Sequence, residues 1–202
     1  MLTKNQERIL NLFRRNILLK STIRQISLNL KKSYSKIHAA VKELEKKNII
    51  IIRKVGKSSV CEIKLSPEII SIFSFLDEQE ARERSLPNYE KLLSLREVSD
   101  YLIIVAGSYA KRTQNKKSDM DLVVIVPDKE NIVNVKGLIE NLTMLYLPEI
   151  HLYVFKRKDF IDMLNEKEEN YGKEIFKNHI ILKNAYVYYE LIKEAIEHGF
   201  KG

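Results

Sequence analysis

The chain has 202 residues, of which 45% are hydrophobic and 31% charged, with a net charge of +8; this composition is typical of a soluble protein with one or two globular domains. It contains no run of the ~20 apolar residues that a membrane-spanning helix needs, no apolar signal-peptide core at its start, and a single cysteine, Cys61, which excludes an intramolecular disulfide or a cysteine-rich zinc site. We therefore expect a cytoplasmic protein with no membrane partner.

The positive charge is concentrated in the first third of the chain. Residues 1–66 carry 16 Lys and Arg against 4 Asp and Glu, whereas residues 67–202 carry 19 against 23. A basic surface confined to one module is typical of proteins that bind a phosphate backbone. An ordinary solvent-exposed, lysine-rich surface would give the same count. The charge count alone therefore does not distinguish the two interpretations, and the residue pattern has to be considered as well.

Residues 1–66 predict helices followed by a hairpin. The third helix has Ile37, Val41 and Leu44 on one face, which leaves its small, polar and basic residues facing outward. Helices are expected over residues 9–17, from a cap at Ser21 or Thr22 to Leu30, and from a cap at Ser33 to about Lys47, and the β-rich runs 49–55 and 60–65 are joined by a turn at Gly56.

This order resembles a winged helix-turn-helix domain, in which the third helix enters the DNA major groove and the hairpin contacts the backbone. The resemblance implies DNA as a partner, although winged helices also serve as protein-interaction modules. Phosphate contacts are expected from Lys31, Lys32, Arg53, Lys54 and Lys57. Base contacts are expected from Tyr34, Ser35, Lys36, His38 and Lys42, of which His38 taken alone is more typical of an ordinary surface residue.

A connecting helix is expected next. Pro67 suits the first turn of a helix, residues 69–76 are largely apolar, and the charged run 77–84 leads to a break at Pro87. Such a helix is a linker or the seam of a homodimer. The predicted domains are a winged helix-turn-helix over residues 1–66, a connecting helix over 67–86 and a second domain over 87–202.

The second domain opens with the most informative segment of the chain. After a helix expected over residues 89–98, an apolar strand over 101–105 ends in Gly107-Ser108, a basic turn follows, and Asp119 and Asp121 then open a second apolar strand. Alternate residues of a strand face the same way, so the two carboxylates lie together and favour a hard cation such as Mg²⁺. The Gly-Ser turn offers backbone N–H groups to a phosphate.

This segment resembles the signature of polymerase-beta-like nucleotidyltransferases, and is most similar to the small prokaryotic members of that superfamily. Gly107, Ser108, Asp119 and Asp121 fall on its motif positions, and Lys111 and Arg112 are typical of the turn. The resemblance implies a mixed sheet flanked by helices. It also implies transfer of a nucleoside monophosphate from a nucleoside triphosphate to a hydroxyl with Mg²⁺, in which Gly107, Ser108, Lys111 and Arg112 bind the nucleotide and the aspartates bind metal.

The third strand, expected over residues 148–155 after a helix over 131–145, departs from that family. In the family this strand supplies a third carboxylate, and here His151 takes its place, with Glu149 two residues earlier on the same face. Three outcomes follow: Glu149 substitutes for the missing carboxylate, His151 acts as a base, or the site is catalytically degenerate. Imidazole is a poor ligand for Mg²⁺, although it can accept a proton near neutral pH.

The rest of the chain predicts helices over 159–164, 172–178 and 185–196 around a short strand over 180–182, and Tyr186, Tyr188 and Tyr189 at helical spacing are expected in the core. The predicted fold class is therefore α+β. The principal hypothesis is a DNA-binding nucleotidyltransferase. The alternatives are a transcriptional regulator whose second domain is a nucleotide sensor or a dimer scaffold, and a toxin–antitoxin component.

Overall fold

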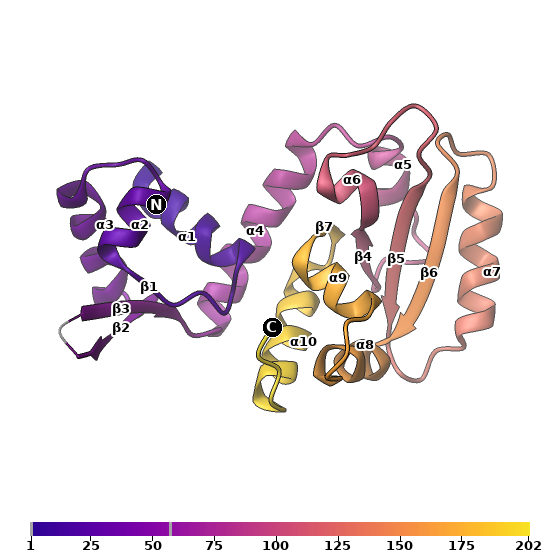
Figure 1. Cartoon of the computed structure of the whole chain (residues 1–202). Coiled ribbons are helices and arrows are strands. Elements are labelled where there is room, and N and C mark those ends of the chain that lie inside the picture. Colours follow the sequence, from indigo (N-terminus) through magenta and orange to yellow (C-terminus); the bar gives the residue numbers. More distant parts are fainter. Residues whose placement is uncertain (1, 57) are drawn as a thin grey trace. The chain divides into compact units, whose positions relative to one another are not determined.

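A computed structural model describes residues 2–56 and 58–202. The chain forms two compact units, Met1–Phe73 and Ser74–Gly202, and the division between them falls inside helix α4 (Pro67–Glu83). Helices accompany a sheet in each unit (Figure 1), so the predicted α+β class is confirmed.

The first unit is a group of helices with a small antiparallel sheet of order β1-β3-β2. This is the element order that the resemblance to a winged helix-turn-helix predicts, with the hairpin β2–β3 at the place expected for the wing. Its elements are α1 (Lys4–Arg15), β1 (Ser21–Thr22), α2 (Ile23–Asn29), α3 (Tyr34–Lys46), β2 (Ile50–Val55) and β3 (Ser58–Ile63).

Local sequence explains where these helices begin. Thr3 and Thr22 each form a capping box with the glutamine three residues later, Gln6 and Gln25. The threonine hydroxyl accepts the backbone N–H of the glutamine, and the glutamine side chain accepts the backbone N–H of the threonine. Ser33 occupies the N-cap position of α3 as expected, but its side chain makes no capping hydrogen bond. Side chains of the three helices, among them Phe13, Ile26 and Leu44, are fully buried and form the core of the unit.

The second unit is built on a mixed four-stranded sheet of order β6-β5-β4-β7. Strands β5 and β6 are parallel, and the other neighbouring pairs are antiparallel. Besides the C-terminal part of α4, the unit contains α5 (Tyr89–Leu93), β4 (Leu102–Val105), α6 (Gly107–Lys111), β5 (Met120–Val126), α7 (Ile132–Thr143), β6 (Ile150–Lys156), α8 (Arg157–Asn165), α9 (Tyr171–Lys177), β7 (Ile180–Lys183) and α10 (Ala185–Glu197).

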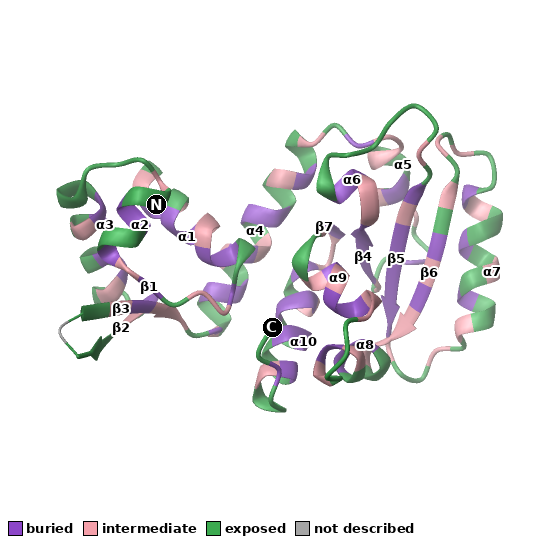
Figure 2. Ribbon diagram, in the orientation of Figure 1, coloured by how far each residue is buried: buried purple, intermediate pink, exposed green. Residues whose placement is uncertain are grey.

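Helices cover both faces of this sheet. Leu122 and Val124 of β5 pack in one cluster with Val135 and Ile139 of α7, while α8 and α10 contact the strands as well. Because both faces are covered, every residue of β5 except Asp121 is buried, as Figure 2 shows for the central strands. Asp121, the second residue of β5, thus carries a partly exposed carboxylate near the start of an otherwise buried strand.

Two details differ from the sequence prediction. Helix α5 ends at Leu93 instead of Val98, and the Ser94 hydroxyl that follows it donates to the Lys91 carbonyl at 2.8 Å. Tyr188 and Tyr189 are fully buried as expected, whereas Tyr186 is 39% exposed. Of the helices in the described part of the chain, none has the length and apolarity that crossing a membrane requires.

Candidate functional site

The Gly107 turn lies directly against the start of β5. Val105, the last residue of β4, pairs with Leu122, and the Ala106 N–H donates to the Asp121 carbonyl at 2.9 Å. Gly107 has φ of +59°, which L side chains rarely adopt, and a Cβ atom built on it would lie 1.9 Å from Asp121 Oδ2. Only glycine therefore lets the chain turn here while the Asp121 carboxylate stays in place.

His151 is the neighbour of Asp121 on the next strand. The parallel register of β5 and β6 places the two residues side by side, and His151 Nδ1 lies 3.5 Å from Asp121 Oδ1. The Asp121 side chain is 26% exposed and that of His151 is 61% exposed. The Tyr153 hydroxyl lies 3.3 Å from the same His151 nitrogen. His151, at the position where the resemblance predicts a third carboxylate, therefore lies beside Asp121.

The electrostatic environment of Asp121 is unfavourable for a charged carboxylate. Its pKa is raised above the ordinary value, chiefly by burial and further by the carboxylates of Glu174 and Asp119, while His151 and Lys111 act in the opposite direction. A bound cation would reverse this penalty, since it stabilises the ionised form.

Asp119 and Glu149 lie at the same end of the sheet. Asp119 is exposed and immediately precedes β5; Glu149 is exposed and immediately precedes β6, where its carbonyl accepts the Met120 N–H at 2.9 Å. Within residues 2–56 and 58–202, no three His, Cys, Asp or Glu side chains gather closely enough to hold a metal ion.

The two basic residues of the turn, Lys111 and Arg112, lie in different surroundings. Lys111 Nζ lies 2.5 Å from Glu174 Oε1, which joins α6 to α9. Arg112, in the left-handed region at φ +58°, lines a cavity of about 300 Å³ with Glu83, Arg84, Leu86, Tyr109 and Gln114. Ser108 is half-buried, and its carbonyl accepts the Thr113 N–H at 2.9 Å.

Helix α9 adds residues that sequence reasoning missed. Glu174 reaches the site through Lys111, and the Tyr171 ring packs on Tyr153 with centroids 4.6 Å apart. The Tyr171 hydroxyl is buried without a hydrogen-bond partner among the described residues, and burial raises its pKa. No motif marks these residues, although the N-cap Asn170 does mark where the helix begins.

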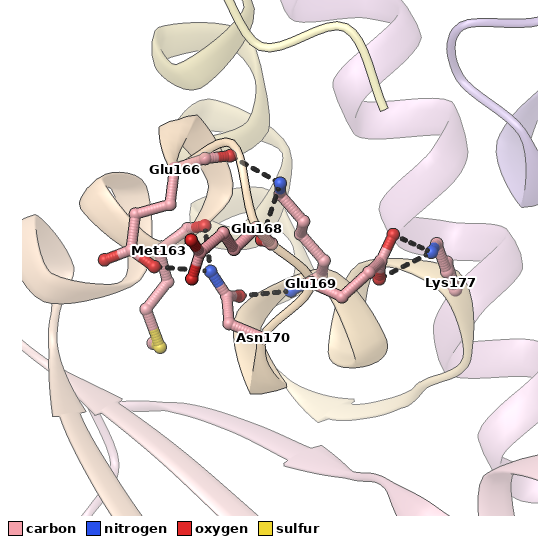
Figure 3. Close-up of polar contacts among 7 residues, drawn as sticks. Met163, Glu166, Glu168, Glu169, Asn170 and Lys177 are labelled. Carbon is pink, nitrogen blue, oxygen red and sulfur yellow. Dashed lines mark hydrogen bonds and ion pairs between the residues drawn. The ribbon is translucent and has the colours of Figure 1, made fainter.

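The loop between α8 and α9 is held by a dense set of polar contacts (Figure 3). Asn170 donates to the Met163 carbonyl and to Glu166, and its side-chain oxygen accepts the Lys173 N–H. Lys173, only 8% exposed, donates through Nζ to the carbonyls of Glu166 and Glu168. These contacts fix the start of α9 and thereby the positions of Tyr171 and Glu174.

In the first unit, the residues expected to contact DNA lie on the surface. Lys42 pairs with Glu45 at 2.8 Å, and Arg53 pairs with Glu62 across the hairpin. Lys57 lies outside the described residues. His38 is half-buried beside the Tyr34 ring, and the exposed members are Lys31, Lys32, Tyr34, Ser35, Lys36, Lys42, Arg53 and Lys54.

No curated protein matches this chain. One similar solved structure is the crystal structure of MepR, a transcription regulator of the Staphylococcus aureus multidrug efflux pump MepA. It is 16% identical, the similarity covers 45% of this chain and 70% of that chain, and the TM-score is 0.33, too low to assign a fold or a function. Residues 89–183 of this chain match the family model described as "Nucleotidyltransferase domain", and this segment contains Gly107, Asp121 and His151.

Proposed function

We propose that the protein binds DNA through its first unit and that its nucleotidyltransferase domain transfers a nucleoside monophosphate from a nucleoside triphosphate to a hydroxyl. The contact between the Gly107 turn and the Asp121 carboxylate carries this proposal. In this proposal, backbone N–H groups suited to phosphate lie next to a carboxylate suited to a divalent cation. The match of residues 89–183 to the nucleotidyltransferase domain supports the same assignment.

Each residue of the site has a role in binding. The N–H groups after Gly107 and the Ser108 hydroxyl hold the phosphates, and Lys111 supplies a positive charge at the end of α6. Asp121 and Asp119 hold a divalent cation together with phosphate oxygens. When bound, the cation stabilises the charge on the attacking and leaving oxygens.

A second candidate function rests on His151. The imidazole of His151 lies beside Asp121, at the position where the resemblance to nucleotidyltransferases predicts a third carboxylate. A domain that binds nucleotide but turns it over slowly or not at all would act as a sensor, and the basic first unit would pass the signal to DNA. The protein would then be a nucleotide-responsive transcriptional regulator.

The first unit supports the DNA-binding part of the proposal. Residues 1–66 hold 16 of the 35 Lys and Arg residues, and the N-terminal half of α3 presents polar and basic side chains to solvent. In helix-turn-helix domains this helix reads base edges while surrounding cations contact phosphates. We place Tyr34, Ser35, Lys36, His38 and Lys42 in the reading role.

A labelled-nucleotide experiment tests the two candidates together. Full-length protein would be incubated with nucleoside triphosphates labelled at the α-phosphate, a divalent cation, and protein, DNA and RNA acceptors. Transfer of label that disappears in the Asp119→Ala, Asp121→Ala double variant supports transfer. Nucleotide binding without transfer, accompanied by altered DNA affinity, supports the sensor.

The control is Glu190→Ala, which removes an exposed carboxylate on α10 of the same unit. It is expected to retain the wild-type behaviour. Undiminished transfer by the double variant would show that the label is moved by something other than this site.

A further inference from the structure

We infer that His151 Nδ1 and Asp121 Oδ1 are two ligands of one divalent cation, and that the nitrogen makes this site prefer a first-row transition metal ion, such as Mn²⁺, to Mg²⁺. The inference rests on the proposed nucleotide site and specifies its metal. It assigns His151 a role different from that of a base or a degenerate replacement.

The separation of the two atoms is the first reason. At 3.5 Å, His151 Nδ1 and Asp121 Oδ1 are farther apart than the 2.7–3.2 Å of an ordinary hydrogen bond. Two adjacent ligands each about 2.1 Å from one octahedral ion lie about 3.0 Å apart. A small rotation of the two side chains that brings these atoms about 0.5 Å closer would therefore let both bind one ion.

The backbone fixes this geometry. His151 and Asp121 are register partners on adjacent parallel strands, and the Asp121 carboxylate is confined on its other side by the Gly107 turn. Neither residue needs to move its backbone for both side chains to reach one ion. A ligand pair held by two paired strands is more precise than one held by loops.

The neighbours of the imidazole identify which of its nitrogens faces the site. The Tyr153 hydroxyl lies 3.3 Å from His151 Nδ1, and its ring centroid lies 4.6 Å from that of the histidine. Asp121 Oδ1 lies near the same nitrogen. A metal ion bound by Nδ1 would need this nitrogen in its unprotonated form.

Two further carboxylates, those of Glu174 and Asp119, act on Asp121, while Lys111 pairs with Glu174. In this inference triphosphate oxygens complete the coordination, as is usual for divalent cations at nucleotide sites, and metal binding is coupled to nucleotide binding.

The donor set decides which ion is preferred. Mg²⁺ takes oxygen ligands, whereas imidazole nitrogen favours first-row transition ions, whose affinities rise from Mn²⁺ to Cu²⁺. A site with one imidazole nitrogen among carboxylate and phosphate oxygens therefore still accepts Mg²⁺ but binds Mn²⁺ more tightly.

Pulsed electron paramagnetic resonance of Mn²⁺ bound to the full-length protein with a non-hydrolysable triphosphate analogue tests this directly. Coupling of the Mn²⁺ electron spin to a ligand nitrogen is expected in the wild type and should vanish in His151→Asn. Mg²⁺ competition is the second readout: His151→Asp should lower the preference for Mn²⁺ by at least on the order of tenfold, because a carboxylate replaces the nitrogen.

Matched variants keep the result specific. His198→Gln removes an exposed imidazole at the end of α10 and should keep the nitrogen coupling, as should Tyr153→Phe, which cannot bind metal at that position. Mn²⁺–nucleotide binding without nitrogen coupling, or coupling that persists in His151→Asn, overturns this inference and leaves the proposed function standing. Failure to bind nucleotide with either ion overturns both.

Discussion

Gly107 and Asp121 occupy the same small volume: the place where a Cβ atom of residue 107 would stand is filled by the Asp121 carboxylate, 1.9 Å away at Oδ2. The residues are 14 positions apart in sequence and are brought together by the antiparallel pairing of β4 with β5. The turn that we propose to bind phosphate and the carboxylate that we propose to bind metal are therefore in direct contact, and changing either should disturb the other.

Gly107→Ala should damage both stability and nucleotide binding. The added methyl group displaces the carboxylate, and φ of +59° is strained for alanine, so we expect a loss on the order of 1–3 kcal/mol in the free energy of unfolding. Nucleotide affinity should fall at least about tenfold, since the turn and the carboxylate both shift. Chemical denaturation and calorimetric titration measure the two effects.

Gly137→Ala is the matched control. Gly137 lies within α7, and a Cβ atom there would meet no atom within 4 Å. Alanine should stabilise the helix by roughly 0.5–1 kcal/mol and leave nucleotide affinity unchanged. Equal losses in the two variants would refute the specific role of Gly107.

Lys173→Met should loosen the start of α9. The buried ammonium donates to the carbonyls of Glu166 and Glu168, and methionine leaves both carbonyls without this donor at a cost of about 1–3 kcal/mol. Because α9 carries Glu174 and Tyr171, nucleotide affinity should decline as well. Hydrogen exchange of residues 166–177 should accelerate relative to the rest of the unit.

Lys177→Met tests whether any lysine change in α9 has this effect. Lys177 pairs with Glu169 at 2.8 Å, but both side chains are largely exposed, at 49% and 76%, so the pair should contribute only ~0–1 kcal/mol. If Lys177→Met proves as costly as Lys173→Met, the buried network is not what holds the helix.

The stability of the first unit should fall at alkaline pH through Cys61. Burial raises the pKa of its thiol from 9.0 to about 11. The unfolded thiol therefore ionises at a lower pH than the folded one, so the stability that Cys61 contributes is complete below pH 9 and is lost as the pH rises to about 11. Between pH 8 and 10.5 the wild type should lose on the order of 2 kcal/mol more than Cys61→Ala. Urea denaturation of both at each pH measures this difference, and parallel losses would argue against it.

DNA binding should weaken steeply with salt. If Lys32 contacts a phosphate, Lys32→Ala should weaken binding to all sequences alike and reduce the slope of log affinity against log salt by about 1. Lys46→Ala, in the last turn of α3 and paired with Glu43 at 2.9 Å, should leave the slope unchanged. Fluorescence anisotropy with labelled duplexes gives both slopes; identical slopes for wild type and Lys32→Ala would remove Lys32 from the interface.

The elements that were predictable from sequence are those with local causes. Thr22 begins α2 through its capping box, and the apolar run after Asp121 forms a buried strand. The end of α5 was missed because the apolar spacing continues through Val98 and gives no signal for an end at Leu93.

The candidate site was only partly predictable for a similar reason. Gly107 and Asp121 belong to one short motif. His151 lies on the neighbouring strand, and its register with Asp121 can be inferred from the sequence. Glu174 and Tyr171 lie more than 40 residues beyond the motif and approach it only because α9 packs in place, a tertiary contact without a local signal.

Calorimetric titration of a nucleoside triphosphate with a divalent cation into wild type and Asp121→Asn tests whether Asp121 holds a cation for the nucleotide. We expect cation-dependent binding by the wild type and its loss in Asp121→Asn, with the fold retained because a neutral amide suits this partly buried position. Equal affinities of the two proteins for the nucleotide would contradict it.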